Sequence, residues 1–242
     1  MRARVTRSIL SACLCILLPA ATSQALTLAA GAGYRRPVGE LARRFQAETG
    51  VKVELVFGNM GQVMGQIKTG APVDLLLGDQ EFLKKAKLSF AAVASVGRGR
   101  LVLAFAKGVS LAAPTDLAKP AIKRLAMPDR AKAIYGKAGQ EFLAASGLAQ
   151  AVASKLLVVG TVPQVSTYLL SGEVDAGLVN LTDVLAIKER IGGYLLIDPK
   201  LYNPIRIVVG VLKTAPRAGQ AQRFLAFLAS PAARRIMEAH GL

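Results

Sequence analysis

Three short turns contain the residues of this sequence that are best suited to bind a small anion. Each follows an apolar segment and combines glycine with small or polar neighbours: Ala29–Tyr34 (A-A-G-A-G-Y), Gly58–Gly61 (G-N-M-G) and Gly78–Gln80 (G-D-Q). Small residues let the backbone approach a ligand, and free amides at the start of a helix attract negative charge. One such turn could serve only as a tight connection, but three that follow successive strands favour a ligand site. The first turn is not a dinucleotide-binding fingerprint, because Arg36 stands where the third glycine is required.

Histidine and cysteine are scarce, and this excludes much catalytic and metal chemistry. The single histidine, His240, lies two residues from the end, and both cysteines, Cys13 and Cys15, lie near the start. Zinc sites built on several histidines are therefore excluded, and a Ser-His-Asp triad would have to use a terminal histidine. We expect a protein that is not an enzyme, has no cofactor and holds no resident metal ion.

The composition is typical of a compact α/β protein with a strongly basic surface. Of the 242 residues, 52% are hydrophobic and 19% are charged, and the formal net charge is +16. Such a field attracts anions. The alternative from another class is a basic nucleic-acid-binding protein, but the chain has no recognisable helix-turn-helix, zinc module or aromatic RNA-binding stripe. We expect no nucleic-acid partner.

The first 25 residues have the pattern of a secretory signal peptide. Three early arginines precede the apolar run Ile9–Leu18, which is too short to span a bilayer, and small residues at Ser23 and Ala25 predict cleavage after Ala25. Lipid attachment at Cys13 is the alternative, although most of the apolar run would then follow the cleavage site. We expect a soluble periplasmic protein, residues 26–242, with no disulfide and, after the loss of three arginines, a net charge of +13.

Strand-like and helix-like patterns alternate along the rest of the chain. Val38, Leu41, Ala42 and Phe45 have the spacing of one helix face, and Gly50 suits a left-handed cap. Further strands are expected over residues 51–57, 74–77, 101–106, 156–159, 176–179 and 205–212, and further helices over 62–69, 133–146, 162–171, 182–190, 224–228 and 231–240. This alternation favours mostly parallel sheets with crossover helices.

Several segments resemble the periplasmic molybdate-binding proteins of ABC importers, which are type II solute-binding proteins. The matching segments are L-T-L-A-A-G-A-G-Y (26–34), T-G-A-P-V-D-L-L-L-G-D-Q (69–80), V-P-Q-V-S-T-Y-L-L-S-G-E-V-D-A-G-L-V-N (162–180), P-I-R-I-V-V-G-V-L (204–212) and the C-terminal segment 224–242. The resemblance covers essentially the whole chain after residue 25. It implies an α/β fold of two lobes, residues 26–102 with 209–242 and residues 103–208, joined by two crossover strands that act as a hinge.

The resemblance also implies a ligand site in the cleft between the lobes. Family members hold a tetrahedral oxyanion with hydroxyls and backbone amides and without a counter-charge. The amides carried over are those of Gly33, Met60, Gly78 and Val162, but the family's two serines fall at Gly33 and Met60 and its tyrosine falls at Asn180.

Other side chains could replace the three missing hydroxyls. The candidates are the Asn59 and Asn180 amides, the Tyr34 hydroxyl, and Arg35 or Lys132 at the rim. Gly61 is a further expected ligand residue, because the second turn could form a nest of backbone amides for an oxyanion. We expect Tyr135 and Tyr168, which lie on apolar helix faces, to be core or rim residues.

The resemblance implies capture of a molybdate- or tungstate-like oxyanion for import. The partners would be this small anion and an inner-membrane ABC permease, and we expect a monomer. The alternative keeps the fold but changes the ligand to a different small anion or organic solute, because the family's hydroxyl ligands are replaced.

Overall fold

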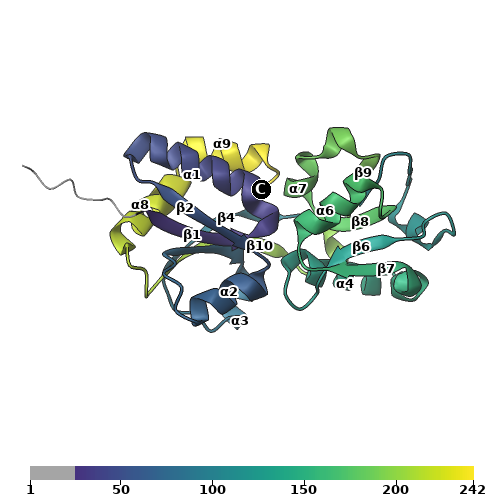
Figure 1. Cartoon of the computed structure of the whole chain (residues 1–242), viewed down its shortest axis with the longest axis horizontal. Helices are drawn as coiled ribbons and strands as arrows, with labels where there is room; N and C mark the ends of the chain where they lie inside the picture. Colours follow the sequence, from purple (N-terminus) through teal and green to yellow (C-terminus); the bar gives the residue numbers. More distant parts are fainter. Residues whose placement is uncertain (1–24) are drawn as a thin grey trace, which may run out of the picture.

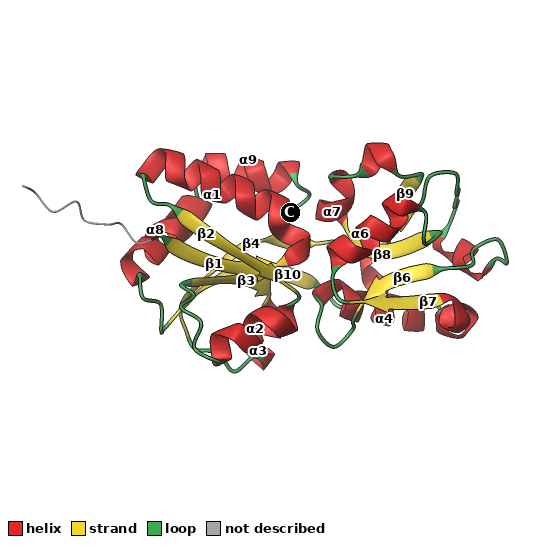
Figure 2. Ribbon diagram, viewed as in Figure 1, coloured by secondary structure: helices red, strands yellow, loops and turns green. Residues whose placement is uncertain are grey.

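The computed structural model describes residues 25–242, and both cysteines and Ser23 of the predicted signal peptide lie outside this range. Two sheets of five strands lie side by side, each with helices on both faces (Figure 1). We call each sheet with its helices a lobe. The first lobe contains the N-terminal strands and the C-terminus, and the second lobe is inserted between them (Figure 2).

The first lobe has the strand order β2-β1-β3-β10-β4. Its strands are β1 (Leu26–Gly31), β2 (Val53–Gly58), β3 (Leu75–Asp79), β4 (Phe90–Gly99) and β10 (Ile205–Leu212). Its helices are the 3₁₀ turn η1 (Ala32–Tyr34), α1 (Arg35–Thr49), α2 (Met60–Lys68), α3 (Gln80–Lys85), α8 (Ala218–Leu228) and α9 (Pro231–Ala239).

The second lobe has the strand order β7-β6-β8-β5-β9. Its strands are β5 (Leu101–Phe105), β6 (Leu125–Pro128), β7 (Leu156–Val159), β8 (Ala176–Asn180) and β9 (Gly193–Leu196). Its helices are α4 (Ile134–Ala145), α5 (Ala149–Val152), α6 (Val162–Ser171) and α7 (Leu181–Leu185), with 3₁₀ turns η2 (Pro114–Ala118), η3 (Ala153–Lys155), η4 (Lys188–Arg190) and η5 (Pro199–Leu201).

Strand direction follows the same rule in both lobes. In the first lobe β2, β1 and β3 pair in parallel, and β10 runs antiparallel to both β3 and β4. In the second lobe β7, β6 and β8 pair in parallel, and β5 runs antiparallel to both β8 and β9. Four strands of each sheet therefore point one way and one is reversed, which confirms the expected mostly parallel α/β fold.

The chain changes sheet at two closely adjacent places. Only Arg100 separates β4 from β5, and Gly99 at the end of β4 pairs with Ile205 at the start of β10. The predicted lobe boundaries at 102/103 and 208/209 therefore fall inside β5 and β10. A strand-like pattern looks the same in either sheet, so the pattern alone does not locate the change.

The helix faces pack as their spacing predicts. Val38, Leu41 and Phe45 of α1 are buried, and α1 ends at Gly50, whose φ of 74° is left-handed. The Phe45 ring centroid lies 5.0 Å from that of Phe224 in α8, so the two ends of the chain share one core. Among residues 25–242, no helix is both long and apolar enough to cross a membrane.

Candidate functional site

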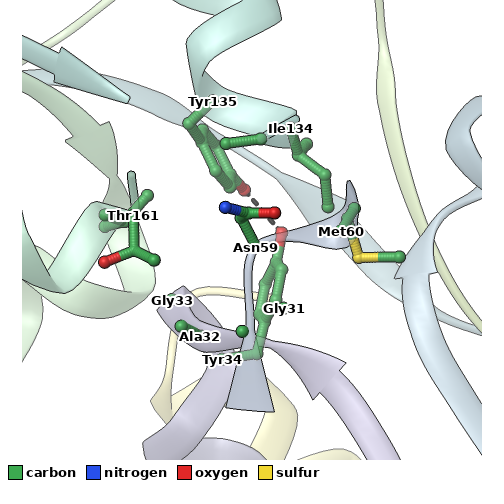
Figure 3. Close-up of a pocket in the computed structure, with 12 residues that line it drawn as sticks. Gly31, Ala32, Gly33, Tyr34, Asn59, Met60, Ile134, Tyr135 and Thr161 are labelled. Atoms are coloured by element: carbon green, nitrogen blue, oxygen red, sulfur yellow. Dashed lines mark hydrogen bonds between the residues drawn. The ribbon is translucent and has the colours of Figure 1, made fainter. Parts of the chain in front are cut away.

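A small cavity lies between the lobes, where strands of both sheets end and helices begin. It offers about 30 Å³ to the centre of a water molecule. The lining residues are uncharged: Gly31, Ala32, Gly33, Tyr34, Gly58, Asn59, Met60, Ala133, Ile134, Tyr135, Thr161 and Val162. Figure 3 draws these residues as sticks, and the side chains of Tyr34 and Tyr135 point toward each other.

The first lobe contributes the turns after β1 and β2. The turn after β1 places Tyr34 in the cavity, and the turn after β2 places Asn59 at the N-cap of α2. The Asn59 side chain accepts a hydrogen bond from the Gln62 amide (2.9 Å), and the Gln62 side chain accepts one from the Asn59 amide (3.0 Å). This capping box fixes the start of α2 at the cavity wall.

The second lobe contributes the turns after β6 and β7. The first leads into α4, which begins with Ile134 and Tyr135. The second ends at Thr161, which forms a capping box with Gln164 at the start of α6 and leaves Val162 as the first helical residue. Each lobe therefore directs the N-terminal end of a capped helix at the same space.

The hydroxyls of Tyr34 and Tyr135 meet across the cavity at 2.7 Å. Their side chains belong to different lobes and are only 1% and 2% exposed. Burial raises the pKa of Tyr34 well above its ordinary value, and burial also raises the pKa of Tyr135. Both phenols therefore keep their protons at neutral pH, so that one donates to the other and each is able to donate to a ligand.

Three further hydrogen bonds join the lobes around the cavity. The Asn59 side-chain amide donates to the Gly160 carbonyl (3.2 Å), and the Asn180 side-chain amide donates to the Gly33 carbonyl (3.0 Å). The Gly61 backbone amide donates to the Lys132 carbonyl (3.1 Å). The structure is therefore a closed arrangement of the two lobes.

Five of the eight predicted site residues line the cavity: Gly33, Tyr34, Asn59, Met60 and Val162. The other three, Gly61, Gly78 and Asn180, are not among its lining residues. Gly78 lies within β3 opposite Val208, and the Met60 side chain covers it.

Gly61 and Asn180 use their amide groups in the bonds between the lobes described above. The Oδ1 atom of Asn180 is buried without a hydrogen-bond partner in the described part of the chain. The two rim candidates also have other contacts. The Arg35 guanidinium stacks 4.4 Å over the Phe57 ring, and the Lys132 ammonium lies 3.9 Å from Asp129.

Tyr135 and Thr161 line the cavity without having been predicted as site residues. Tyr135 shares an apolar helix face with Ala138 and Phe142, so its pattern is that of a core residue. Thr161 carries a recognisable signal, since a threonine three residues before a glutamine is a capping box at a helix start.

The site has the chemistry of a binding site for a neutral or anionic solute. Its lining has hydroxyl and amide groups but no carboxylate or cation. Within residues 25–242, no group of three or more histidine, cysteine, aspartate or glutamate side chains is placed to hold a metal ion.

Comparison with known proteins decides the family. Residues 26–242 match the family of bacterial extracellular solute-binding proteins. The chain belongs to this family. A similar solute-binding protein is the molybdate-binding protein ModA of Azotobacter vinelandii, which is 30% identical over 233 residues, with 93% of this chain and 92% of the relative covered. This relative and ModA of Rhodobacter capsulatus are molybdate-binding proteins, which agrees with the expectation that this chain is a binding protein and not an enzyme.

Solved structures show the same fold. The periplasmic molybdate-binding protein of Azotobacter vinelandii superposes with a TM-score of 0.82 at 24% identity, covering 89% of this chain and 97% of that one. The sulfate-binding protein SubI of Mycobacterium tuberculosis superposes with a TM-score of 0.74 at 19% identity, covering 90% and 85%. This family member therefore has the two-lobed fold of binding proteins whose ligands differ.

Proposed function

We propose that this solute-binding protein captures a molybdate- or tungstate-like oxyanion in the cavity between its lobes and delivers it to an ABC permease. The observation that carries the proposal is the uncharged cavity, which lies at the N-terminal ends of helices from both lobes. The 30% identity to a molybdate-binding protein over nearly the whole chain supports the same ligand class.

The helix ends supply the donors that a dianion needs. Met60 and Val162 are the first residues of α2 and α6, and first-turn amides have no carbonyl within their own helix to bond. The dipoles of α2, α4 and α6 also favour negative charge at these ends. A neutral set of donors can thus hold an anion without a basic side chain, as the amides of Gly33, Met60 and Val162 are proposed to do.

The lobes must part for the ligand to enter. The Tyr34–Tyr135 hydrogen bond and three further hydrogen bonds join the lobes around this cavity, so a ligand reaches it when these bonds break. The hinge is proposed to lie where the chain changes sheet, at Arg100 and at Asn203–Pro204, with the two lobes moving about it. The cavity then closes around the anion, with Asn59 at its wall and the Gly61 amide bonded to the other lobe beside it.

The site departs from the family's pattern at the positions that usually carry hydroxyls. Gly33 and Met60 stand at the two serine positions, and Asn180 stands at the tyrosine position. This departure favours a second candidate, in which the same cleft takes another small anion or organic solute. Sulfate binding by a protein of the same fold shows that the architecture serves other anions.

The proposed setting is the periplasm. The predicted signal peptide would be removed after Ala25, and the released protein would act as a monomer that meets the permease at the inner membrane. In the alternative, a lipid at Cys13 would anchor the protein to the membrane in the same compartment.

Isothermal titration calorimetry on the exported protein tests the ligand. The panel is molybdate, tungstate, sulfate, phosphate and small carboxylates, with thermal unfolding measured in parallel. We expect molybdate and tungstate to bind most tightly, and each to stabilise the protein by about 2.7 kcal/mol at a hundred times its Kd. Preferential binding of a carboxylate would favour the second candidate, and no binding of any oxyanion would overturn the proposal.

A further inference from the structure

We infer that the hydroxyls of Tyr34 and Tyr135 are the hydroxyl donors of this site, one from each lobe, and that the bound oxyanion takes the place of their mutual hydrogen bond. This inference rests on the proposed function. It assigns the donor role to a pair that stands at neither the serine nor the tyrosine positions of the family's pattern, and one of its members was expected only in the core or at the rim.

One of the two hydroxyl protons of this pair has no acceptor among residues 25–242. Two phenol groups carry two protons, and their single mutual bond uses one of them. No other hydrogen bond to either hydroxyl is present in residues 25–242. A buried donor left without an acceptor is costly, and an oxyanion between the two oxygens would accept both protons.

The two tyrosines occupy corresponding places in the lobes. Tyr34 follows β1 and Tyr135 follows β6, and each of these strands lies second from the edge in its sheet. The ring centroids are 6.3 Å apart with planes tilted by 50°, so the rings are not stacked and only the hydroxyls approach. An anion held by both would be gripped by both lobes at once, which couples binding to closure.

Gly99, the last residue of β4, lies next to the proposed hinge, and its lack of a side chain leaves space for the two tyrosine hydroxyls. A Cβ atom at Gly99 would collide with the Tyr135 hydroxyl and would lie 3.1 Å from the Tyr34 hydroxyl. Gly99 is not among the residues with positive φ, so the position requires glycine for space and not for backbone conformation. The site and the crossover strand are therefore in direct contact.

The test is calorimetry with molybdate and with tungstate on Tyr34→Phe, Tyr135→Phe and the double variant. The control is Tyr194→Phe, which removes the same atom from β9, an edge strand of the second lobe. We expect each single site variant to raise the Kd about tenfold or more, because a hydrogen bond to a charged acceptor is lost. The control should change the Kd by less than about twofold.

Tyrosine emission gives a second readout that a structural role would not move. The chain has five tyrosines and no tryptophan, so its intrinsic fluorescence reports on tyrosine alone. We expect molybdate to change the emission of the wild type and of Tyr194→Phe, and to leave the double variant unchanged at a saturating concentration.

Gly99→Ala is an independent variant that retains both hydroxyls but displaces them. Gly219→Ala in α8 is its matched control, because a Cβ atom there meets nothing within 4 Å. We expect only Gly99→Ala to weaken binding, with ligand-free thermal unfolding measured to confirm that all variants are folded.

The outcomes separate the two proposals. If the wild type binds an oxyanion and the tyrosine variants bind it as tightly as Tyr194→Phe does, the donor assignment is wrong while the proposed function stands. If the wild type binds no oxyanion, the proposed function fails and the donor assignment fails with it. Weaker binding by both single variants, with an unchanged control, supports both proposals.

Discussion

The two lobes are built on one plan, and their differences show which parts of the plan serve stability and which serve the ligand. The strand orders β2-β1-β3-β10-β4 and β7-β6-β8-β5-β9 correspond strand for strand, and in both sheets the fourth strand is the reversed one. The second strands, β1 and β6, lead to the buried Tyr34 and Tyr135. The edge strands β2 and β7 lead to α2 and α6, and each of these helices begins with a capping box. The cavity is formed where these corresponding ends meet.

Away from the cavity, the lobes differ in how firmly one turn is anchored. Asp74 precedes β3: its backbone amide donates to the Thr27 carbonyl, and its carboxylate accepts a hydrogen bond from the Thr27 amide. Asp175 precedes β8 and makes the same two bonds with Arg124. Asp74 is fully buried and also pairs with the Arg217 guanidinium at 3.1 Å. The same local turn is thus a buried anchor in the first lobe and a more exposed one in the second.

The largest expected effect on stability comes from removing the aspartates of these two turns. Asp74→Ala removes a fully buried carboxylate that accepts hydrogen bonds from the Thr27 and Arg217 amides and pairs with the Arg217 guanidinium, so we expect a loss of about 3–5 kcal/mol in the free energy of unfolding. Asp175→Ala should cost less, about 1–3 kcal/mol, because it removes only hydrogen bonds near solvent. Denaturant unfolding followed by circular dichroism measures both, and equal losses would contradict the distinction.

The capping boxes of α2 and α6 allow the two lobes to be compared at the cavity. Asn59→Ala and Thr161→Ala each remove an N-cap, at a cost of about 1 kcal/mol. Asn59→Ala also removes the bond to the Gly160 carbonyl in the other lobe, so we expect it to cost about 0.5–1.5 kcal/mol more. Chemical unfolding of the two variants side by side tests this, and a larger loss for Thr161→Ala would refute it.

Replacing Asn180 should have a smaller effect, which we expect in the radius of gyration more than in the free energy of unfolding. It is the N-cap residue of α7, but its side chain makes no capping bond and instead holds the Gly33 carbonyl of the other lobe. We expect Asn180→Ala to loosen closure and to increase the radius of gyration of the ligand-free protein in small-angle scattering. Asp198→Ala, at the N-cap of η5, is the control and should leave the radius unchanged.

The smallest effect depends on pH. Burial raises the pKa of Asp183 in α7, although a hydrogen bond from Ser166 and the charge of Arg36 act in the opposite direction. A raised pKa in the folded state means that the charged form is disfavoured there, so this group's contribution to stability falls as pH rises through the folded pKa. Asp183→Asn should therefore gain most relative to the wild type at neutral pH, with the gain shrinking in acid.

Urea unfolding at several pH values measures this dependence. Glu173→Gln, which changes an exposed carboxylate of the same lobe, is the control. A gain for Asp183→Asn that grows as the pH is lowered would show that the sign is wrong.

The parts of the site that depend on neighbouring residues could be predicted from the sequence. The turn after β1 contains small residues because the backbone itself forms the wall there, and Asn59 caps α2 through Gln62, only three residues away. The strand and helix alternation also predicted the mostly parallel sheets. These features are local, so spacing along the chain carries them.

The parts that depend on the meeting of two lobes could not be predicted. Tyr135 lies 101 residues from its partner Tyr34, and on its own helix it has the pattern of a core residue. Gly78 has the pattern of a ligand turn, but Met60 covers it. The chain leaves the first sheet through Arg100 alone, and one polar residue between two strands carries no mark of a lobe boundary.

The most direct test of the account is to locate the anion itself. Crystals grown with tungstate should give an anomalous difference peak at the tungsten absorption edge. We predict one strong peak between the hydroxyls of Tyr34 and Tyr135, next to the first amides of α2 and α6. No peak in the cavity, with tungstate only on the basic surface where Arg98 opposes Arg206, would contradict it.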